Sequence, residues 1–169
     1  MRKQKGFSLI ELLIVVAIIL IIAAIAIPNL LSARKSANES SAVGSLRTIN
    51  TGEVSFQGKH GAYTCTLGDL GPAPGDAYLD ALLAGATAAG TSKSGYYFKP
   101  GTCGAAVAIP PAIAPVTTPV VSYEWWTQPA NQGVTGNSSF CTDTSAVIWK
   151  DVASPSSGVT CLATKTPIG

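Results

Sequence analysis

The chain has 169 residues, a length that suits one globular domain with an appended segment. Charged residues make up 12% of it, well below the roughly 25% that is usual for soluble domains. The formal net charge is +2, from 11 basic and 9 acidic residues, and the basic residues Arg2, Lys3 and Lys5 precede all the others. Without these three, eight basic residues face nine acidic ones, which gives −1 and excludes a strongly basic nucleic-acid-binding surface.

One long apolar run follows the basic residues. From Phe7 to Ile27 only Ser8 and Glu11 are polar. At 1.5 Å per residue these 21 residues span about 31 Å, the thickness of a bilayer core. The run therefore predicts a membrane-spanning helix over residues 7–27, and the basic residues before it predict a cytoplasmic N-terminus.

Two general interpretations of this run are open. A secretory signal peptide would share the basic start, the apolar stretch and the small-x-small site Ala24-Ile25-Ala26, but the stretch is long for one and a carboxylate inside it is out of place. A plain membrane anchor for an unrelated binding domain or enzyme fits the length, and Glu11 would then only reach towards the headgroups. Neither interpretation gives Glu11 a role.

The residues around Glu11 favour a third interpretation. Residues 5–13, KGFSLIELL, strongly resemble the class III signal of type IV pilins and type II secretion pseudopilins. The resemblance implies that a prepilin peptidase cuts after Gly6 on the cytoplasmic side and that the new N-terminal residue, Phe7, is N-methylated. The apolar run would stay on the mature protein. The resemblance covers residues 1–57 and, more weakly, the C-terminal part of the chain.

Cleavage would give Glu11 a partner, the new amine of Phe7, either of the same chain or of a neighbour. A carboxylate in the middle of a bilayer costs about 2.5–3.5 kcal/mol, so such residues tend to be functional and paired. In filaments of the family that the signal resembles, the apolar helices form a central bundle, and the glutamate meets the N-terminal amine of an adjacent subunit, here that of Phe7. Because an unpaired charge is heavily penalised in a dry bundle, the pair would fix the axial register of the subunits.

The helix is expected to continue beyond the membrane. After Pro28 the apolar residues recur mostly every three or four positions, which is typical of an amphipathic helix. They are Leu30, Leu31, Ala33, Ala37, Val43, Leu46, Ile49 and Phe56. Pro28 lacks a backbone donor and predicts a kink between Ala24 and Pro28. Gly44 and Gly52 weaken the helix slightly and are expected to let a sheet approach, and the helix is expected to end in the region 58–61.

Four cysteines, Cys65, Cys103, Cys141 and Cys161, all lie after the apolar run. An even number on the exported side of a membrane predicts two disulfides. Three pairings are possible, of which we favour the sequence-local one, Cys65–Cys103 and Cys141–Cys161. A zinc site is disfavoured because no cysteines are closely spaced and His60 is the single histidine.

The remainder of the chain predicts a head built on a sheet. Residues 76–85 read as a short helix with Asp76 as its N-cap and Gly85 as its stop. Strands are expected at residues 94–101, 103–109, 120–128, 138–142 and 146–150, and the proline-rich residues 109–119 are excluded from the centre of a sheet. Since neighbouring strand residues face opposite sides, one of Trp125 and Trp126 is expected to be exposed.

These elements predict an α+β, pilin-like fold. A long N-terminal helix, membrane-spanning in its first half, would pack on a C-terminal antiparallel sheet of about four strands. The expected organisation is a cleaved leader at residues 1–6, the long helix at residues 7–57 with a transmembrane or filament-core part at 7–27, and a disulfide-stapled head at residues 58–169.

The sequence predicts a structural subunit and no enzyme. No catalytic arrangement, cofactor or metal site is expected: His60 sits in a polar linker, and turn roles are favoured over calcium binding for Asp143 and Asp151. The resemblance implies a bacterial inner-membrane protein, with its head in the periplasm, that an assembly platform and its ATPase build into a filament of identical copies. A pseudopilin of a type II secretion system is the alternative, although the Tyr-Pro usual after the long helix of major secretion pseudopilins reads here as Ala62-Tyr63-Thr64.

Overall fold

The computed structural model describes residues 6–72, 77–107, 119–151, 161 and 166–168. The chain divides into two compact units, Met1–Arg34 and Lys35–Gly169, which we describe separately.

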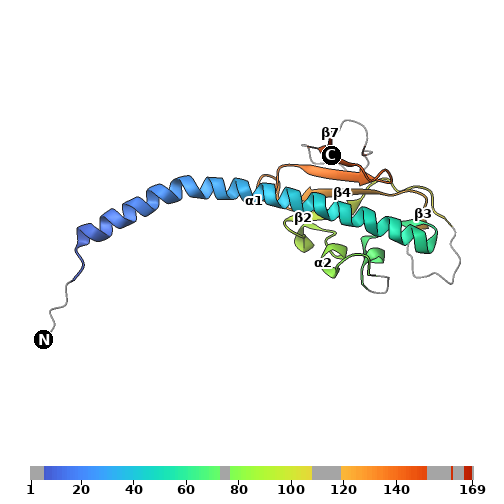
Figure 1. The fold of residues 1–169 in the computed structure, drawn as a ribbon, viewed down its shortest axis with the longest axis horizontal. Helices are drawn as coiled ribbons and strands as arrows, with labels where there is room; N and C mark the ends of the chain where they lie inside the picture. The colour runs from blue at the N-terminus through green and yellow to red at the C-terminus, as the bar shows by residue number, and fades with distance from the viewer. Residues whose placement is uncertain (1–5, 73–76, 108–118, 152–160, 162–165, 169) are drawn as a thin grey trace. The chain divides into compact units, whose positions relative to one another are not determined.

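Helix α1, Leu9–His60, is 52 residues long and contains both the apolar run and the amphipathic segment (Figure 1). The prediction of a long N-terminal helix is confirmed, although the helix starts at Leu9 instead of Phe7 and ends at His60. It passes through Pro28 without interruption, because a proline removes one hydrogen bond of the helix and leaves the others in place. The kink at Pro28 stays a prediction.

From Leu12 to Ile27, in the first unit, α1 is apolar on all sides. An 18-residue window of the helix has a mean hydropathy of 3.3, and none of it is buried within the chain. By length and composition this helix is able to cross a membrane. A helix that is apolar all round requires lipid or other apolar helices around it.

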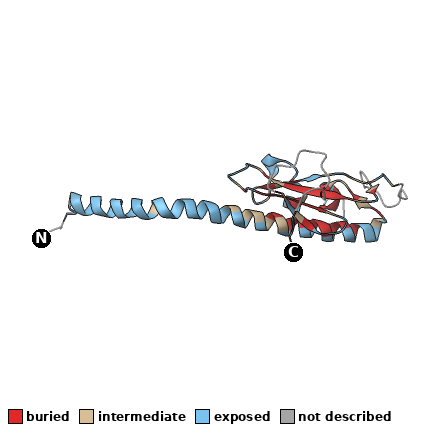
Figure 2. Ribbon diagram, turned by 90° about the horizontal axis from the view of Figure 1, so that it is seen from above, coloured by how far each residue is buried: buried red, intermediate tan, exposed pale blue. Residues whose placement is uncertain are grey.

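In the second unit one face of α1 is buried (Figure 2). Its buried residues are Ala42, Ser45, Leu46, Ile49, Asn50, Gly52, Glu53 and Phe56. Leu46, Ile49 and Phe56 confirm the predicted apolar face, whereas Leu30 and Leu31 are exposed. Four residues of this face are not apolar: Ser45, Asn50 and Glu53 have polar side chains, and Gly52 has none. The apolar spacing did not indicate their burial.

Gly44 and Gly52 were expected to let a sheet approach α1, and the structure gives neither of them this role. A Cβ at Gly52 would lie 3.4 Å from Leu79 Cδ2 and 3.5 Å from Tyr78 Cβ, so the loop that contains these residues approaches the helix there. A Cβ at Gly44 would have nothing within 4 Å.

The main sheet of the described residues has five antiparallel strands in the order β2-β4-β5-β6-β7. They are β2 Tyr96–Pro100, β4 Glu124–Pro129, β5 Ser139–Asp143, β6 Ile148–Asp151 and β7 Thr166–Ile168. A second sheet pairs β1, Tyr63–Thr64, with β3, Pro119–Val120. The α+β class is confirmed, and the sheet has one strand more than expected because β7 adds to β6.

Two of the predicted strands are wrong in extent. In the predicted strand 103–109 the described residues make one bridge, from Ala106 to Val120. The predicted strand 120–128 is divided into β3 and β4, because the chain leaves the small sheet after Val120 and enters the main sheet at Glu124. Of the proline-rich residues 109–119 only Pro119 is described, and it lies in the two-stranded sheet.

Helix α2, Ala81–Ala84, is shorter than the helix predicted over residues 76–85. Its N-cap is Asp80 and not Asp76, which lies outside the described residues. The Asp80 carboxylate accepts the Leu83 N–H at 2.9 Å and pairs with Lys93 Nζ at 2.8 Å. Gly85 ends the helix, as expected. Short 3-10 turns lie before and after α2, at Leu67–Leu70 and Ala89–Thr91.

Both tryptophans of β4 are buried, which makes the expected exposure of one of them wrong. Trp125 is 1% exposed and belongs to the main core with Ile49 and Phe56 of α1. Trp126 is 5% exposed and packs in a separate cluster with Cys141, Cys161 and Trp149. The two side chains do leave the strand on opposite sides, but the Cys141–Cys161 disulfide covers the side on which Trp126 lies.

The structure pairs Cys65 with Cys103 and Cys141 with Cys161, which is the sequence-local pairing. The first bridge joins the end of β1 to the segment after β2, and its Cα atoms are 6.3 Å apart. The second joins β5 to a segment beyond β6, with Cα atoms 5.9 Å apart.

Replacing Cys141 and Cys161 together by alanine is expected to lower the free energy of unfolding by about 3 kcal/mol, because the bridge closes a 20-residue loop and restricts the unfolded chain. The measurement is urea unfolding of the detergent-solubilised full chain, followed by tryptophan fluorescence. Replacing Cys65 and Cys103 is the control: it opens a loop of 38 residues without changing the surroundings of Trp126. Equal stability of the wild type and the Cys141 and Cys161 variant would contradict the prediction.

Candidate functional site

The predicted cleavage point lies just ahead of α1. Gly6, Phe7 and Ser8 are described and are not helical. Phe7 is 87% exposed, and a Cβ at Gly6 would have nothing within 4 Å. A peptide bond in a non-helical, exposed segment has its backbone groups accessible, as a protease requires.

Glu11 caps its own helix. Its Oε2 accepts the backbone N–H of Ser8 at 2.9 Å. Because the helix starts at Leu9, Ser8 is the N-cap residue and Glu11 stands at the third helical position, from which a glutamate can reach back to the cap. The sequence analysis missed this bond, although the spacing Ser8-x-x-Glu11 is the signal of such a cap. The other predicted role of Glu11, in assembly, stays a prediction.

A second carboxylate, Glu53, is buried where α1 meets the sheets. Its side chain is 0% exposed. Oε1 accepts the indole N–H of Trp125 at 2.8 Å, and Oε2 accepts the backbone N–H of Thr64 at 3.1 Å. Glu53 thus joins the helix to β4 of the main sheet and to β1 of the small sheet.

A further acid extends this network. The Thr64 hydroxyl donates to Asp69 Oδ2 at 2.8 Å, and Asp69 is itself buried. Burial raises the pKa of Glu53 from its ordinary 4.5 to about 7, and the charge of Asp69 raises it too, while the bonds from Thr64 and Trp125 lower it. A buried carboxyl group that titrates near neutral pH is a property that the sequence analysis did not predict.

Asn50, about one helical turn before Glu53, is a second polar link between α1 and the main sheet. Its Nδ2 donates to the Thr142 hydroxyl at 2.8 Å, and its Oδ1 accepts from the Tyr123 hydroxyl at 3.3 Å. Burial, followed by the charge of Glu53, raises the pKa of the Tyr123 phenol well above its usual range. Asn50 and Glu53 therefore replace apolar contacts with directional bonds that fix the helix on the sheet.

The start of the second unit holds a third polar connection. Glu39 Oε1 accepts the backbone N–H groups of Asn137 at 2.8 Å and Ser138 at 3.1 Å. The neighbouring Asn38 donates from Nδ2 to the Thr135 carbonyl at 2.8 Å. The loop between β4 and β5 is thereby tied to α1.

His60, Asp143 and Asp151, which the sequence analysis considered for catalysis or calcium binding, lie at the ends of a helix and of two strands. His60 is the last residue of α1 and stacks on Phe56, with ring centroids 4.3 Å apart. Asp143 accepts the backbone N–H of Ser145 at 2.8 Å in the turn after β5, and Asp151 ends β6. Among the described residues there is no group of three or more His, Cys, Asp or Glu side chains that could hold a metal ion.

A long N-terminal helix followed by antiparallel sheets is the α+β, pilin-like arrangement that the sequence predicts. A model of the prokaryotic N-terminal methylation motif matches residues 1–27, so the N-terminal segment of this chain carries that motif. The resemblance to the pilin signal is confirmed.

Two type IV pilins are similar to this chain. The type IV wide pilus major component PilA4 of Thermus thermophilus is 50% identical over 64 residues, which are 38% of this chain and 49% of that protein. The type IV major pilin protein PilA of Myxococcus xanthus is 42% identical over 72 residues, which are 43% of this chain and 33% of that protein. The match therefore spans about half of one relative and a third of the other.

Proposed function

We propose that this chain is a structural subunit of a type IV pilus and not an enzyme. The observation that carries the proposal is the methylation motif over residues 1–27, which includes the strongly apolar first part of α1. The two similar proteins are named as major pilus components, which supports a pilus over the pseudopilus of a type II secretion system.

In this proposal a prepilin peptidase removes residues 1–6 and the amine of Phe7 is methylated. The remaining chain consists of the long helix, which the structure places at Leu9–His60, and of the head that follows it. Before assembly residues 7–27 span the bacterial inner membrane, with the N-terminus in the cytoplasm and the head in the periplasm. The basic residues ahead of the run support this orientation.

Assembly then moves the apolar helix from lipid into a bundle of identical helices. Both surroundings are apolar, so the transfer itself costs little. The charge that must be neutralised is that of Glu11, and the amine of Phe7 on an adjacent copy supplies the opposite charge. An inner-membrane platform with its ATPase would drive the movement.

The N-terminus of the mature protein tests the proposal. Mass spectrometry of the purified full chain is expected to find a peptide that begins at Phe7 and carries one extra methyl group on its amine. A Gly6→Val variant is expected to keep residues 1–6 and lack the methyl group, because a branched side chain keeps a protease from the backbone.

Gly58→Val is the matched control, since a Cβ at Gly58 also has nothing within 4 Å. This variant should be processed like the wild type. A wild-type chain that begins after Ala26 would instead identify an ordinary signal peptide and overturn the proposal.

A further inference from the structure

A short connector, residues 61–71, leads from the end of α1 towards α2 and contacts the helix at Glu53. It contains β1 and the 3-10 turn Leu67–Leu70. The backbone N–H of Thr64 donates to Glu53 Oε2 at 3.1 Å, and Leu70 Cδ1 lies 3.8 Å from the place of a Cβ at Gly52. The connector therefore packs on the buried face of α1 beside Glu53.

Two carboxyl groups lie at this contact. Glu53 is 0% exposed, and its two donors, the Trp125 indole and the Thr64 backbone, are both neutral. The Thr64 hydroxyl donates in turn to Asp69, which is 8% exposed, so one threonine links the two acids. Burial penalises each negative charge, and two carboxylates so close repel each other. The closed contact is therefore more stable when Glu53 holds a proton.

We propose that Glu53 is a proton-dependent latch for the connector. With a proton, its carboxyl group holds the connector closed on α1. As a carboxylate, it favours an open connector, in which water reaches both acids. The raised pKa of Glu53, about 7, places the change near neutral pH. This inference goes beyond the proposed function and does not depend on it.

The connector is the wall of this site that opens most easily. β1 is two residues long and pairs with the two residues of β3. β4, which carries Trp125, is six residues long and lies between β2 and β5 in the main sheet. Short elements with few hydrogen-bonded neighbours open at a lower free energy than the centre of a sheet. The carboxylate therefore reaches water by displacing the connector, while the main sheet stays in place.

Two features limit how far the connector opens. Leu67 and Leu70 are 2% and 0% exposed and belong to the main core, so they favour the closed form. The Cys65–Cys103 disulfide ties the connector to the segment after β2. The opening is thus a local, reversible movement that exposes two leucines and leaves the rest of the head folded.

Other titratable groups surround Glu53. Tyr63 of β1 and Tyr123 stack with ring centroids 5.0 Å apart, and phenols titrate near pH 10 or above. The charge of Asp143, at the end of β5, acts on Tyr123. His60, about two turns further along α1, carries an imidazole, a group that as a class titrates between pH 5 and 8. A test must therefore compare proteins that keep all these groups and differ only in Glu53.

Hydrogen exchange of the detergent-solubilised full chain, read by mass spectrometry at pH 5 and pH 8, tests the latch. The reporters are the bonded N–H groups of Thr64, Thr66, Asp69 and Gly71. Their protection, corrected for the pH dependence of exchange in an unfolded chain, should fall at least about tenfold from pH 5 to pH 8. The reason is that a raised pKa changes such an equilibrium by up to about tenfold per pH unit. The amides of β5 should keep their protection.

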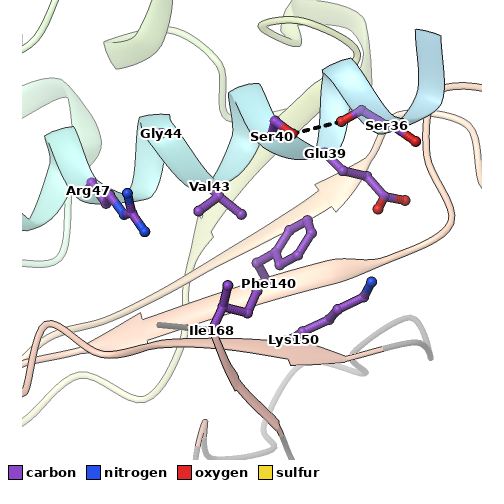
Figure 3. A pocket seen from close by; sticks show the side chains of 9 residues that line it. All are labelled: Ser36, Glu39, Ser40, Val43, Gly44, Arg47, Phe140, Lys150 and Ile168. Carbon is purple, nitrogen blue, oxygen red and sulfur yellow. Dashed lines mark hydrogen bonds between the residues drawn. The ribbon is translucent and has the colours of Figure 1, made fainter. Parts of the chain in front are cut away.

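Two variants separate Glu53 from the other acids. Glu53→Gln has no proton to release, so the protection of its connector should not fall with pH, whatever its level at pH 5. Glu39→Gln is the matched control. Glu39 also accepts two backbone N–H groups, but it is only partly buried and lines a groove beside α1 (Figure 3). Its variant should behave like the wild type.

Connector protection that stays constant with pH in the wild type would overturn the latch, and so would an equal fall in Glu53→Gln. An equal fall in β5 would also overturn it, because the whole head would then open. The comparison of the connector with β5 in the wild type holds even where Glu53→Gln does not fold. None of these results depends on cleavage at Gly6 or on filament yield, so the proposed function succeeds or fails separately.

Discussion

Glu11→Ala is expected to insert into the membrane like the wild type and to yield at least about tenfold fewer filaments. Removing one partner of a buried ion pair leaves the other unpaired, which costs about 3–5 kcal/mol. In the proposed filament the unpaired group is the amine of Phe7. Membrane insertion depends on the apolar run and improves slightly when a charge is removed. The measurements are membrane fractionation of the chain and the quantity of filament sheared from cells.

Glu11→Gln separates the two roles of this side chain. A glutamine keeps an oxygen that accepts the Ser8 N–H and so caps the helix, but it has no charge for the amine. It should therefore assemble as poorly as Glu11→Ala. Normal filaments from Glu11→Gln, with few from Glu11→Ala, would show that the cap is what matters and would contradict the proposed ion pair.

Glu53→Gln is expected to make the head more stable at pH 8 and to change little at pH 5. The pKa of Glu53 is raised to about 7 in the folded protein from an ordinary 4.5, so between these values the folded state holds a proton that the unfolded state releases. The free energy of unfolding therefore falls as the pH rises from 4.5 to about 7, by about 1.4 kcal/mol per pH unit and by about 3 kcal/mol in total. Glutamine does not titrate and removes this loss.

The measurement is urea unfolding of both proteins between pH 4.5 and 8. Acids outside this network contribute equally to both proteins, so the difference between the two curves reports on Glu53 together with its interaction with Asp69. Trp125→Phe provides a second variant: it removes the indole donor that lowers the pKa of Glu53 and should extend the window to higher pH. A difference that does not vary with pH would contradict the raised pKa.

Much of the helix was predictable because its cause is local. An unbroken apolar run and regular apolar spacing specify a helix without reference to distant residues. Glu53 shows the limit of that reasoning, since a charged residue was not expected in the core. Its position, four residues after Ile49 and three before Phe56, does place it on the buried face. The missing information was the pair of donors, Thr64 and Trp125, which only the folded chain brings together.

The head was less predictable because its limits depend on contacts between distant segments. Trp126 is buried because Cys161, which is distant in the sequence, packs against it. The alternation of side chains along β4 does not include this contact and therefore predicted an exposed tryptophan. The N-cap of α2 was assigned to Asp76, but Asp80 has a second partner in Lys93, which lies in a different segment. Of the candidate site, the residues of the N-terminal signal were identified from the sequence, and the buried network around Glu53 was not.

The bond between Ser8 and Glu11 has a consequence for the order of events in the proposed filament growth. It engages one oxygen of the carboxylate, Oε2, and a carboxylate has lone pairs for several donors. The arriving amine of a neighbour can therefore bind the other oxygen without first breaking the cap. Docking would add a bond to an end that is already ordered, so the subunit would not pass through a frayed helix terminus as it leaves the lipid.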